Sequence, residues 1–414
     1  MVLEQLTKPI PTTKPGFDYD LAIVGGAIAG ATLASALKNS GLRVVLIEAQ
    51  PQSVAVARRQ AYNLSILSGR IFDGIGVWDR ILPQITVYNQ IRLSDADYSG
   101  IVQFHPADLG TDALGYVGEH YPVLKSLQEF LADCDNVSWL CPAEVVNVEY
   151  QPSGVKIEVK VNDEYRQLQT RLVVAADGAR SRIRTSAGIN TKGWKYWQSC
   201  VTARIKPEKS HNNTAFERFW WSGPMGVLPL PDNLCQVVWT APHAEAKALK
   251  ELDEKEFLKL LEVRTGGILG RLELDSDRLL FPVQLMQSDR YTKSRLALIG
   301  DAAHCCHPVG GQGLNMGIRD AAALAQVLQE AQQRGEDIGD VKVLKRYEHW
   351  RKRENLAILG FTDFLDRMFS NSWLPLVVIR RLGLWMLQWI RPLKVYALRL
   401  MTGLKGRPPQ LAQR

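Results

Sequence analysis

Three separated segments of the chain carry glycines and carboxylates whose spacing suits the binding of phosphates and sugar hydroxyls. Backbone N–H groups at a glycine turn can face a phosphate, and a carboxylate at the end of a buried strand can accept a hydrogen bond from a hydroxyl. Each segment alone is a weak signal, but together they predict that distant parts of the chain converge on one long dinucleotide, and they favour a flavin. The residues predicted to bind it from these segments are Gly25, Gly26, Ala27, Gly30 and Glu48; Asp177, Gly178 and Arg184; and Gly300, Asp301, Pro308, Gly311, Gln312, Gly313 and Asn315.

The first segment has the pattern of a strand, a helix and a second strand. A short apolar run ends at Gly25, an Ala- and Leu-rich run follows from Gly30, and a second apolar run ends at Glu48. Such a turn aims the helix N-terminus at a pyrophosphate, and Glu48 can accept a hydrogen bond from an adenosine ribose hydroxyl. Ala27 departs from the G-x-G-x-x-G pattern, so the fit to phosphate must be looser or displaced there. A plain strand–helix–strand unit with a glycine turn is the alternative.

The second and third segments also follow buried strands. Asp177 comes directly after the apolar run 172–176, although an isolated Asp-Gly pair is usually only a turn. Gly300 lets the chain pass close to a ligand, so that Asp301 can accept a hydrogen bond from the ribityl chain of a flavin. The glycine-rich stretch that follows precedes an apolar helix at about 315–329. The positive N-terminus of that helix suits the negative charge near N1 and C2=O of a reduced flavin.

Four consecutive residues inside the third segment look like metal ligands. They cannot all point at one tetrahedral ion, and no second ligand cluster stands nearby in the sequence. We therefore predict no metal site, and expect small side chains that pack beneath a flavin-binding loop. These residues are His304, Cys305, Cys306 and His307.

The motifs resemble those of the class A flavoprotein aromatic hydroxylases, and more closely those of the ubiquinone-biosynthesis hydroxylase family. Residues 177–184 match the D-G-x-x-S-x-x-R motif of that group, and residues 300–315 match its G-D-A-A-H…P…G-G-Q-G-x-N motif almost fully. Parts of the stretch 211–230 resemble the quinone-pathway branch. The resemblance covers about residues 18–410, with Ala27 as a departure.

The resemblance implies an FAD-dependent monooxygenase that hydroxylates a prenylated phenol or quinol precursor in quinone biosynthesis, with NAD(P)H and O2 as cosubstrates. It also implies that Asp177 and Gly178 lie near both FAD and NAD(P)H, and that either Arg58 or Arg59 faces the flavin. A phenolic substrate calls for a general base or a proton relay. The candidates, which no spacing argument separates, are Tyr196, His211, Tyr291 and His307.

Two alternative functions stay open. An isoprenoid reductase or an epoxidase would keep the FAD-binding fold and change the reaction, and the Asp177-Gly178 motif favours the hydroxylase over both. A non-catalytic flavin-binding scaffold of a quinone-synthesis complex is the other. Reduction of the flavin by NAD(P)H would separate this scaffold from the enzymes.

The expected fold class is α/β, with a Rossmann-like FAD-binding domain, an inserted antiparallel-sheet substrate domain and a C-terminal helical tail. Residues 18–187 and 285–370 are assigned to the FAD-binding domain, 188–284 to the substrate domain and 371–414 to the tail. Residues 1–16 lack the apolar core of a signal peptide and suggest a loose arm. Five tryptophans of the substrate domain either line an apolar pocket or pack in its core: Trp194, Trp197, Trp220, Trp221 and Trp239.

The net charge of +7 is concentrated in the tail. Residues 371–414 contain eight Lys and Arg residues and no acid, so residues 1–370 carry a net charge of −1. A basic tail suggests an anionic surface, and the dense apolar residues among its cations favour lipid over nucleic acid. Six cysteines in 414 residues are too few for a disulfide framework and fit a reducing compartment. We expect a cytoplasmic protein with peripheral membrane association.

Helical periodicity refines this expectation. Pro392 should split the tail into two helices, whose apolar runs are too short to span a bilayer. A basic arc with aromatic residues outside it is typical of a helix that lies at an anionic membrane surface. The alternative is a C-terminal helix packed on the body with solvated cations. The cations that share the arc are Arg380, Arg381, Arg391, Lys394, Arg399 and Lys405.

Overall fold

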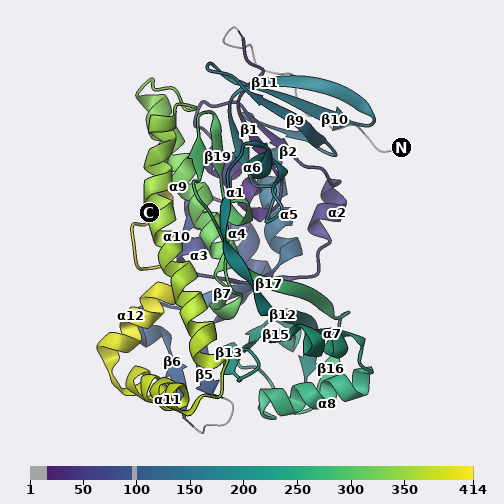
Figure 1. Cartoon of the computed structure of the whole chain (residues 1–414), viewed down its shortest axis with the longest axis vertical. Coiled ribbons are helices and arrows are strands. Elements are labelled where there is room, and N and C mark those ends of the chain that lie inside the picture. The colour runs from purple at the N-terminus through teal and green to yellow at the C-terminus, as the bar shows by residue number, and fades with distance from the viewer. Residues whose placement is uncertain (1–15, 96–99, 414) are drawn as a thin grey trace.

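The computed structural model describes residues 16–95 and 100–413, which form three sheets and a set of C-terminal helices (Figure 1). The arm expected at 1–16 lies, apart from Gly16, outside the described residues. The α/β fold class, with a second sheet rich in antiparallel strands and a helical C-terminal part, is confirmed.

The first sheet carries the three glycine-bearing segments at one edge. Its strands β19, β11, β1, β2 and β8 are parallel neighbours in that order, and β18, β10 and β9 extend it with antiparallel pairs. Parallel strands end at the same edge of a sheet, so Gly25, Asp177 and Gly300 follow the adjacent ends of β1, β11 and β19. The strands are β1 (Tyr19–Val24), β2 (Val44–Ile47), β8 (Val137–Leu140), β9 (Glu144–Tyr150), β10 (Val155–Val161), β11 (Glu164–Ala175), β18 (Thr292–Lys293) and β19 (Leu296–Leu298).

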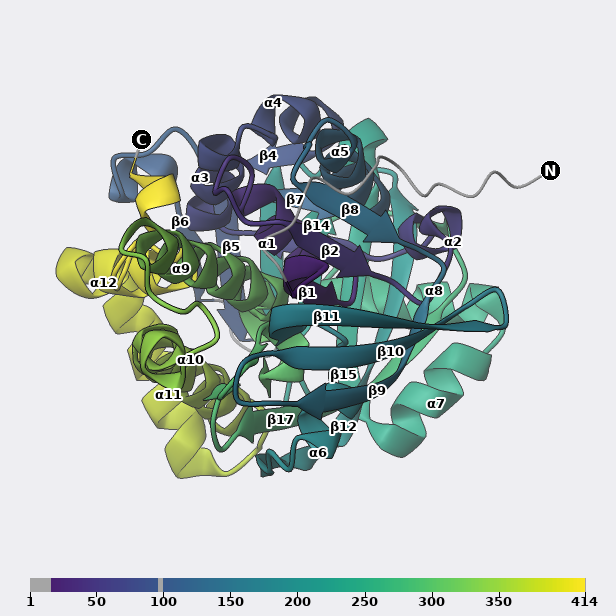
Figure 2. The same cartoon turned by 90° about the horizontal axis from the view of Figure 1, so that it is seen from above.

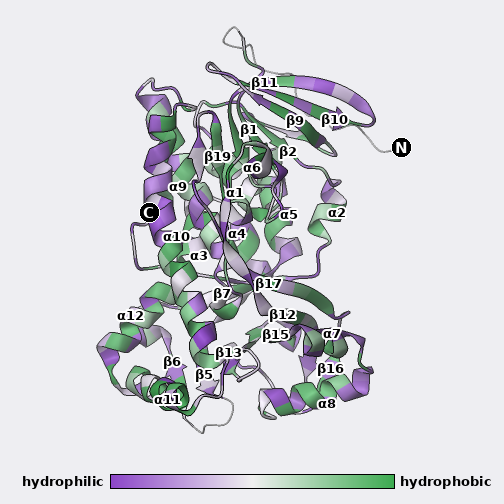
Figure 3. Ribbon diagram, in the orientation of Figure 1, coloured by the Kyte–Doolittle hydropathy of each residue, from purple (hydrophilic) through white to green (hydrophobic). Residues whose placement is uncertain are grey.

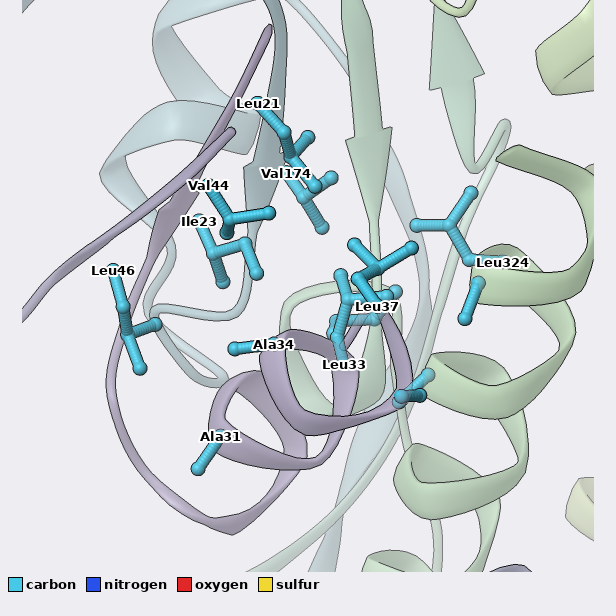
Figure 4. Close-up of a cluster of buried hydrophobic side chains, with 14 of the residues drawn as sticks. Leu21, Ile23, Ala31, Leu33, Ala34, Leu37, Val44, Leu46, Val174 and Leu324 are labelled. Atoms are coloured by element: carbon cyan, nitrogen blue, oxygen red, sulfur yellow. The ribbon is translucent and has the colours of Figure 1, made fainter. Parts of the chain in front are cut away.

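The helix α1 is buried between this sheet and the helices α5 and α9. Figure 4 shows Ile23 of β1 and Val174 of β11 close to Leu33 and Leu37 of α1, with Leu324 of α9 beside them. A helix that is apolar nearly all round is stable only when it is covered on every side, which explains why α1 carries no polar face. The helices are α1 (Ile28–Ala36), α5 (His120–Ala132) and α9 (Gly313–Gln333).

A three-stranded sheet and several short helices complete this half of the molecule. The strand β7 lies between β3 and β4 and pairs with both in antiparallel fashion. These elements are β3 (Ala61–Leu64), β4 (Thr86–Tyr88), β7 (Gly115–Glu119), α2 (Gln52–Val56), α3 (Ile66–Ile75), α4 (Trp78–Ile81), α6 (Arg182–Ser186) and the 3-10 helices η1 (Leu82–Gln84), η2 (Pro106–Asp108), η4 (Gly300–Ala302), η5 (Val309–Gly311) and η6 (Gln410–Ala412).

The second sheet is built mainly from residues 191–288, but two of its strands come from much earlier in the chain. β13 pairs in parallel with β5. The other strand pairs among the described residues of this sheet, including β5 with β6, are antiparallel. Residues 90–95 and 101–104, which fall in the range predicted for the FAD-binding domain, therefore contribute to the second sheet. Its elements are β5 (Gln90–Asp95), β6 (Ile101–Phe104), β12 (Thr191–Pro207), β13 (Thr214–Phe219), β14 (Met225–Pro229), η3 (Pro231–Asn233), β15 (Cys235–Pro242), α7 (His243–Glu251), α8 (Glu254–Thr265), β16 (Leu272–Leu274), β17 (Leu279–Ser288) and β20 (His304–Cys305).

One face of the second sheet packs on α7 and α8. Val237 and Trp239 of β15 belong to a buried cluster that includes Phe257 of α8. Side chains alternate along a strand, so Gln236 and Val238 point to the opposite face. Both line the cavity described below, and the second sheet therefore separates a packed core from a cavity wall.

Three helices form the C-terminal part of the chain. The long helix α10 runs beside α9, and α11 and α12 lie next to the strands β5 and β6 (Figures 1 and 2). Ile390 lies between α11 and α12, and Pro392 is the second residue of α12, which confirms the predicted break. No helix among the described residues is long and apolar enough to cross a membrane. The helices are α10 (Val341–Phe369), α11 (Leu374–Trp389) and α12 (Arg391–Met401).

Candidate active site

A cavity of about 1440 Å³ brings the three glycine-bearing segments together with the second sheet and the C-terminal helices. Nine of the predicted cofactor-binding residues line it: Ala27, Arg58, Gly178, Gly300, Asp301, Pro308, Gly311, Gln312 and Gly313. The other eight do not line the cavity: Gly25, Gly26, Gly30, Glu48, Arg59, Asp177, Arg184 and Asn315. Those whose contacts are described below hold the surrounding backbone in place.

The first segment is a tight turn that only glycine permits. Gly25 has φ +109°, and a Cβ there would lie 2.4 Å from the carbonyl oxygen of Ala176. A Cβ at Gly30 would lie 1.9 Å from the carbonyl oxygen of Gly25. Ala27, the departure from the glycine pattern, is the N-cap of α1 and lines the cavity with its extra methyl group. The first and third glycines are thus required by packing, whereas position 27 is not.

Glu48 holds the same turn from the neighbouring strand. Its Oε2 accepts a hydrogen bond from the N–H of Gly26 at 2.7 Å, and its Oε1 accepts one from Gln50 N–H at 2.9 Å. Glu48 stands directly after the end of β2, where the sequence argument placed it. Its contact with an adenosine ribose stays a prediction.

The second segment is tied to the third by Arg184. This buried side chain donates to the carbonyl oxygen of Ala302 and to that of Ala179, each at 2.9 Å. Gly178 has φ +84° and open space where a Cβ would lie, and it lines the cavity. Asp177 Oδ1 is buried and has no hydrogen-bond partner among the described residues. Asp177 does not line the cavity, and its contact with a cofactor stays a prediction.

A buried ion network fixes the third segment. Asp320 Oδ2 lies 2.6 Å from His304 Nε2 and accepts from Gly300 N–H at 3.2 Å, while its Oδ1 lies 2.9 Å from Arg351 Nε. Burial alone would raise the pKa of Asp320, but His304 and Arg351 outweigh it and lower the pKa to about 2. Asp301 lines the cavity, and loss of solvation raises the pKa of its carboxyl, an effect that His304 offsets only in part.

Asn315 connects the glycine-rich loop to β3 and α3. Its Oδ1 accepts from Ser65 N–H at 2.8 Å and from the Ser68 hydroxyl at 2.7 Å. Its Nδ2 donates to the carbonyl oxygens of Asn63 and Gly311, both at 2.8 Å. All four bonds go to protein groups, so Asn315 positions the loop and does not face the cavity.

Two helix N-termini open into the cavity without a side-chain cap. They belong to α1, after Ala27, and to α9, after Gln312. Free N–H groups and the positive end of a helix dipole attract phosphates and other anions. One N-terminus suits a pyrophosphate and the other suits a flavin ring, so the residues present fit FAD.

The structure also distinguishes the two arginines that the sequence left open. Arg58 lines the cavity, and its charge lowers the pKa of His120, secondarily to burial, at the same wall. Both arginines are exposed, but Arg59 does not line the cavity. Arg58 is therefore the member of the pair that can face a bound flavin.

None of the four candidate bases lines the cavity. The Tyr196 hydroxyl donates to Asp363 at 2.7 Å, and the His211 ring lies 3.1 Å from the carbonyl oxygen of Leu230. Tyr291 is buried beside Asn355. Burial lowers the pKa of His307 to about 4 despite two nearby carboxylates. All four have structural partners, and the hypothesis that one is the base is not supported.

The sequence argument missed Glu217, which does line the cavity. It lies on β13, where Ala215 and Phe219 line the cavity two positions to either side. This alternation was a signal in the sequence, but a strand pattern does not reveal which of its faces meets a ligand.

The tryptophan cluster forms none of this wall. Trp239 is buried in the core against Phe257, and the Trp220 ring lies under the guanidinium of Arg264. Trp194, Trp197 and Trp221 are exposed. The suggestion that these tryptophans line an apolar pocket is therefore wrong. The alternative, packing in the core of the domain, holds for Trp239 but not for the three exposed tryptophans.

The C-terminal helices form an apolar wall of the cavity. Its residues include Phe361, Leu365 and Met368 of α10, Leu387 of α11 and Leu400 of α12. Figure 3 shows α11 coloured largely as hydrophobic. The tail is thus part of the same site as the glycine-bearing segments.

The predicted basic arc does not face outward as a whole. Arg380 is 6% exposed and donates to Asp95 Oδ2 at 3.0 Å and to its Oδ1 at 3.1 Å. Lys394 Nζ lies 2.9 Å from Asp108 Oδ2. The expectation that these two cations face lipid is wrong, because each neutralises a carboxylate of the body. The alternative, a tail packed on the body, describes them better.

One exposed face of the tail is apolar, and it lies beside the exposed cations Arg391 and Arg399. Its largest exposed side chains are Trp373, Leu374, Val378, Leu382, Trp385 and Trp389, which we call the apolar tail face. Three further exposed residues, Ile379, Leu393 and Tyr396, also line the cavity. The cavity therefore reaches the surface beside the apolar tail face.

Comparison with known proteins gives a consistent result. Residues 18–362 match the FAD-binding domain family. The chain is 52% identical over 394 residues to the uncharacterized protein slr1300 of Synechocystis, with 95% of each chain covered. It is 34% identical over 398 residues to the ubiquinone hydroxylase UbiL of Rhodospirillum rubrum, covering 95% of this chain and 92% of the relative.

A solved structure agrees in fold. The p-nitrophenol 4-monooxygenase PnpA of Pseudomonas putida superposes with a TM-score of 0.81 at 21% identity, over 94% of this chain and 98% of that one. Family match, full-length relatives and cavity geometry agree, and the chain belongs to the family of FAD-dependent monooxygenases that includes the ubiquinone-biosynthesis hydroxylases.

Proposed function

We propose that this monooxygenase hydroxylates the ring of a prenylated phenol or quinol in quinone biosynthesis while it is docked on a membrane. In the overall reaction NAD(P)H supplies two electrons, one atom of O2 enters the ring as a hydroxyl, and the other leaves as water. We assign FAD to the parts of the chain at 18–187 and 285–370 and the aromatic ring to the wall formed by the second sheet.

The observation that carries this proposal is the continuity of the cavity. At one end lie Asp301 and the two uncapped helix N-termini, and at the other lie the apolar side chains of α10, α11 and α12. A polar, glycine-lined end suits a flavin, and a long apolar end suits an isoprenoid chain, because such a chain gains about 0.8 kcal/mol for each CH2 group removed from water. A small polar phenol would leave the apolar end without a partner.

The apolar tail face supports membrane docking. Trp389 is 69% exposed and Trp385 is 53% exposed, and tryptophan prefers the interface between water and lipid. Arg391 and Arg399 are exposed on the adjoining helix α12 and can attract anionic lipid headgroups, each contributing on the order of 1 kcal/mol. Because the cavity opens beside this face, a prenylated substrate could pass from lipid to the active site without crossing water.

Within the site, the protein's contribution is position and charge. The N-termini of α1 and α9 would hold the pyrophosphate and the electron-rich edge of the flavin, and Asp301 would accept a hydrogen bond from the ribityl chain. Arg58 would lie beside the cofactor as a fixed positive charge. Bound FAD supplies the redox chemistry of the family, taking electrons from NAD(P)H and delivering them to O2. The apolar helices exclude water from the ring.

The test is turnover with a defined substrate. FAD-loaded protein is mixed with NADPH or NADH, 18O2 and a geranylated phenol in anionic vesicles, and the products are analysed by mass spectrometry. We expect faster NAD(P)H oxidation when the phenol is present and one 18O atom in the ring product.

Other outcomes identify the alternatives. A reduced or epoxidised isoprenoid chain would indicate the reductase or the epoxidase. A flavin that NAD(P)H does not reduce would indicate a scaffold of a quinone-synthesis complex. Oxidation at one rate with every phenol, with only peroxide formed, would contradict the hydroxylase.

A further inference from the structure

We infer that the carboxylate of Glu217 is the catalytic base that takes the proton from the ring hydroxyl of the substrate. The inference rests on the proposed function, since it concerns a phenol bound in the same cavity. It identifies a role that none of Tyr196, His211, Tyr291 and His307 can fill, because these four residues do not line the cavity.

Glu217 stands on the cavity face of the second sheet. It lies opposite Leu93 of β5 and Gly226 of β14 in the strand register. Leu93 and Gly226 line the cavity as well. A Cβ at Gly226 would lie only 3.5 Å from Glu217 Oε2, so the glycine leaves the space in front of the carboxylate open to a ligand.

The carboxylate also lies near the flavin-binding loop. The backbone N–H of Gly310 lies close enough to oppose the rise in the pKa of Glu217, and Gly310 belongs to the loop that runs from Pro308 to Gly313. Gly310 has φ +71°, a conformation that favours glycine. Glu217 therefore bridges the wall assigned to the substrate ring and the loop assigned to the cofactor, which is where a base for the reacting ring must lie.

Among the ionisable groups of the cavity, Glu217 is the one that can act as a base on the ring hydroxyl. Of the described residues that line the cavity, only Glu217 and Asp301 carry a carboxyl group, and Asp301 belongs to the cofactor segment. No ion pair of the described part of the chain includes Glu217. Of the strands paired with β13, β14 presents no charge to it, and β5 presents Asp95, which pairs with Arg380. Farther along the same sheet, β12 presents the thiol of Cys200, whose pKa is raised to about 12, first by burial and in part by Glu217. The cations of the cavity wall are Arg58, Arg180, Lys195 and Arg380.

Burial also shifts the pKa of Glu217 toward the range that suits a general base. It raises the pKa of this carboxyl to about 8, although the Gly310 N–H acts in the opposite direction. A general base is most effective when its pKa lies near the working pH. The carboxylate form is the active one, so hydroxylation should increase as the pH rises through about 8.

The proton transfer balances over the whole reaction. The ring O–H bond breaks, its electron pair stays on the ring oxygen, and the proton moves to Glu217. The negative ring oxygen raises the electron density at the ortho and para carbons, where the new C–O bond forms. When the ring regains its aromaticity, Glu217 returns its proton to that oxygen, which regenerates the carboxylate. The ring gives up its C–H proton to the second oxygen atom of O2, which leaves as water.

The experiment compares Glu217→Gln with the wild type as FAD-loaded proteins. Glutamine keeps the shape and an acceptor for Gly310 N–H but cannot take a proton. We expect FAD affinity to change by less than about threefold, hydroxylation of 2-geranylphenol to fall by about 100-fold, and peroxide release to increase. Glu273→Gln, which removes an exposed carboxylate of the same sheet, is the control and should match the wild type.

The second readout does not depend on turnover. Bound 2-geranylphenol in the wild type should show ultraviolet absorbance of the phenolate that increases with an apparent pKa near 8, and the hydroxylation rate should follow the same curve. Glu217→Gln should lose both pH dependences, while Glu217→Asp, which retains a carboxylate, should restore part of each. The aspartate variant also decides the matter if the glutamine variant does not fold.

The outcomes separate the two proposals. Equal rates and equal pH profiles in wild type and Glu217→Gln would overturn the role of Glu217 and leave the hydroxylase intact. A wild type that ionises the bound phenol through Glu217 but forms no hydroxylated product would overturn the hydroxylase and leave the role of Glu217 intact. Absence of any phenolate signal in the active wild-type enzyme would overturn the role of Glu217.

Discussion

Replacing Arg380 with alanine should destabilise the protein by about 3–5 kcal/mol, because it removes one partner of a buried ion pair. The side chain donates two hydrogen bonds to Asp95 and two more to the carbonyl oxygens of Phe369 and Asn371. Asp95 is 2% exposed. Arg381 lies 3.4 Å from Asp95 Oδ2 and is more open to solvent, so it compensates only in part. The expected loss is therefore near the lower end, about 3 kcal/mol.

Urea unfolding followed by tryptophan fluorescence measures this loss. The matched control is Arg391→Ala, since Arg391 is an exposed arginine of the adjoining helix α12, and it should cost less than about 0.5 kcal/mol. The double variant Arg380→Ala with Asp95→Ala should cost less than the sum of the single variants, because the buried carboxylate is removed together with its partner.

Two results would refute this reasoning. One is an Arg380 variant as stable as the Arg391 control, and the other is strict additivity in the double variant. The outcome also bears on the membrane proposal. Reversing the charge at Arg380 would detach the tail from the body, so loss of vesicle binding in such a variant would not report on contact with lipid.

Three further outcomes test the cofactor site and the tail. Gly25→Val should abolish FAD binding, because a Cβ there would lie 2.4 Å from a backbone carbonyl oxygen. Ala27→Gly should bind FAD at least as well as the wild type. If Ala27→Gly lost FAD, that result would contradict the pyrophosphate role of this turn. Asp301→Ala should weaken FAD binding by about 1–3 kcal/mol in a fluorescence titration, and unchanged affinity would refute the ribityl contact. Replacing Trp385 and Trp389 together with Ala should lower the affinity for anionic vesicles by about tenfold without loss of FAD. Wild-type protein that stays in the supernatant at low salt would refute membrane docking.

The cofactor segments could be found in the sequence because their signals are local. A glycine after a buried strand reports on the backbone at that point, as the contacts of Gly25 and Gly30 show. Strand polarity then places the ends of parallel strands at one edge. The sequence could not show which residues of a motif face the cavity and which hydrogen-bond to other parts of the protein. Asn315 and Arg184 belong to the motifs, yet their hydrogen bonds go to the framework.

The tail shows where local patterns fail. The helical wheel placed Arg380 and Lys394 on one arc, but it could not tell whether that arc faces water, lipid or protein. The answer depends on Asp95 and Asp108, carboxylates that lie nearly three hundred residues earlier and meet the tail only in the folded chain. The same basic arc can pair with lipid phosphates or with carboxylates of the protein, so the pattern does not identify its partner.

Glu217 was missed for a related reason. The alternation along β13 predicts that Ala215, Glu217 and Phe219 share a face, but the pattern is the same whether that face meets a core, a cavity or solvent. The face is fixed by the parallel partner β5, by α7 and α8 behind the sheet, and by the Gly310 loop in front of it. Long-range pairing of this kind leaves no spacing signal in the sequence.

The polarity of the cavity also fixes how a prenylated phenol would enter it. If the isoprenoid chain entered first, the ring hydroxyl would be left among the apolar side chains of α10, α11 and α12, where burying a polar group without a hydrogen-bond partner costs free energy. If the ring enters first, its hydroxyl reaches Glu217 and the chain remains along α10, α11 and α12, beside the opening at the apolar tail face. Both ends of the substrate then meet their preferred surroundings. Ring-first entry is therefore the orientation that the proposed docking surface, the apolar helices and the proposed base favour together.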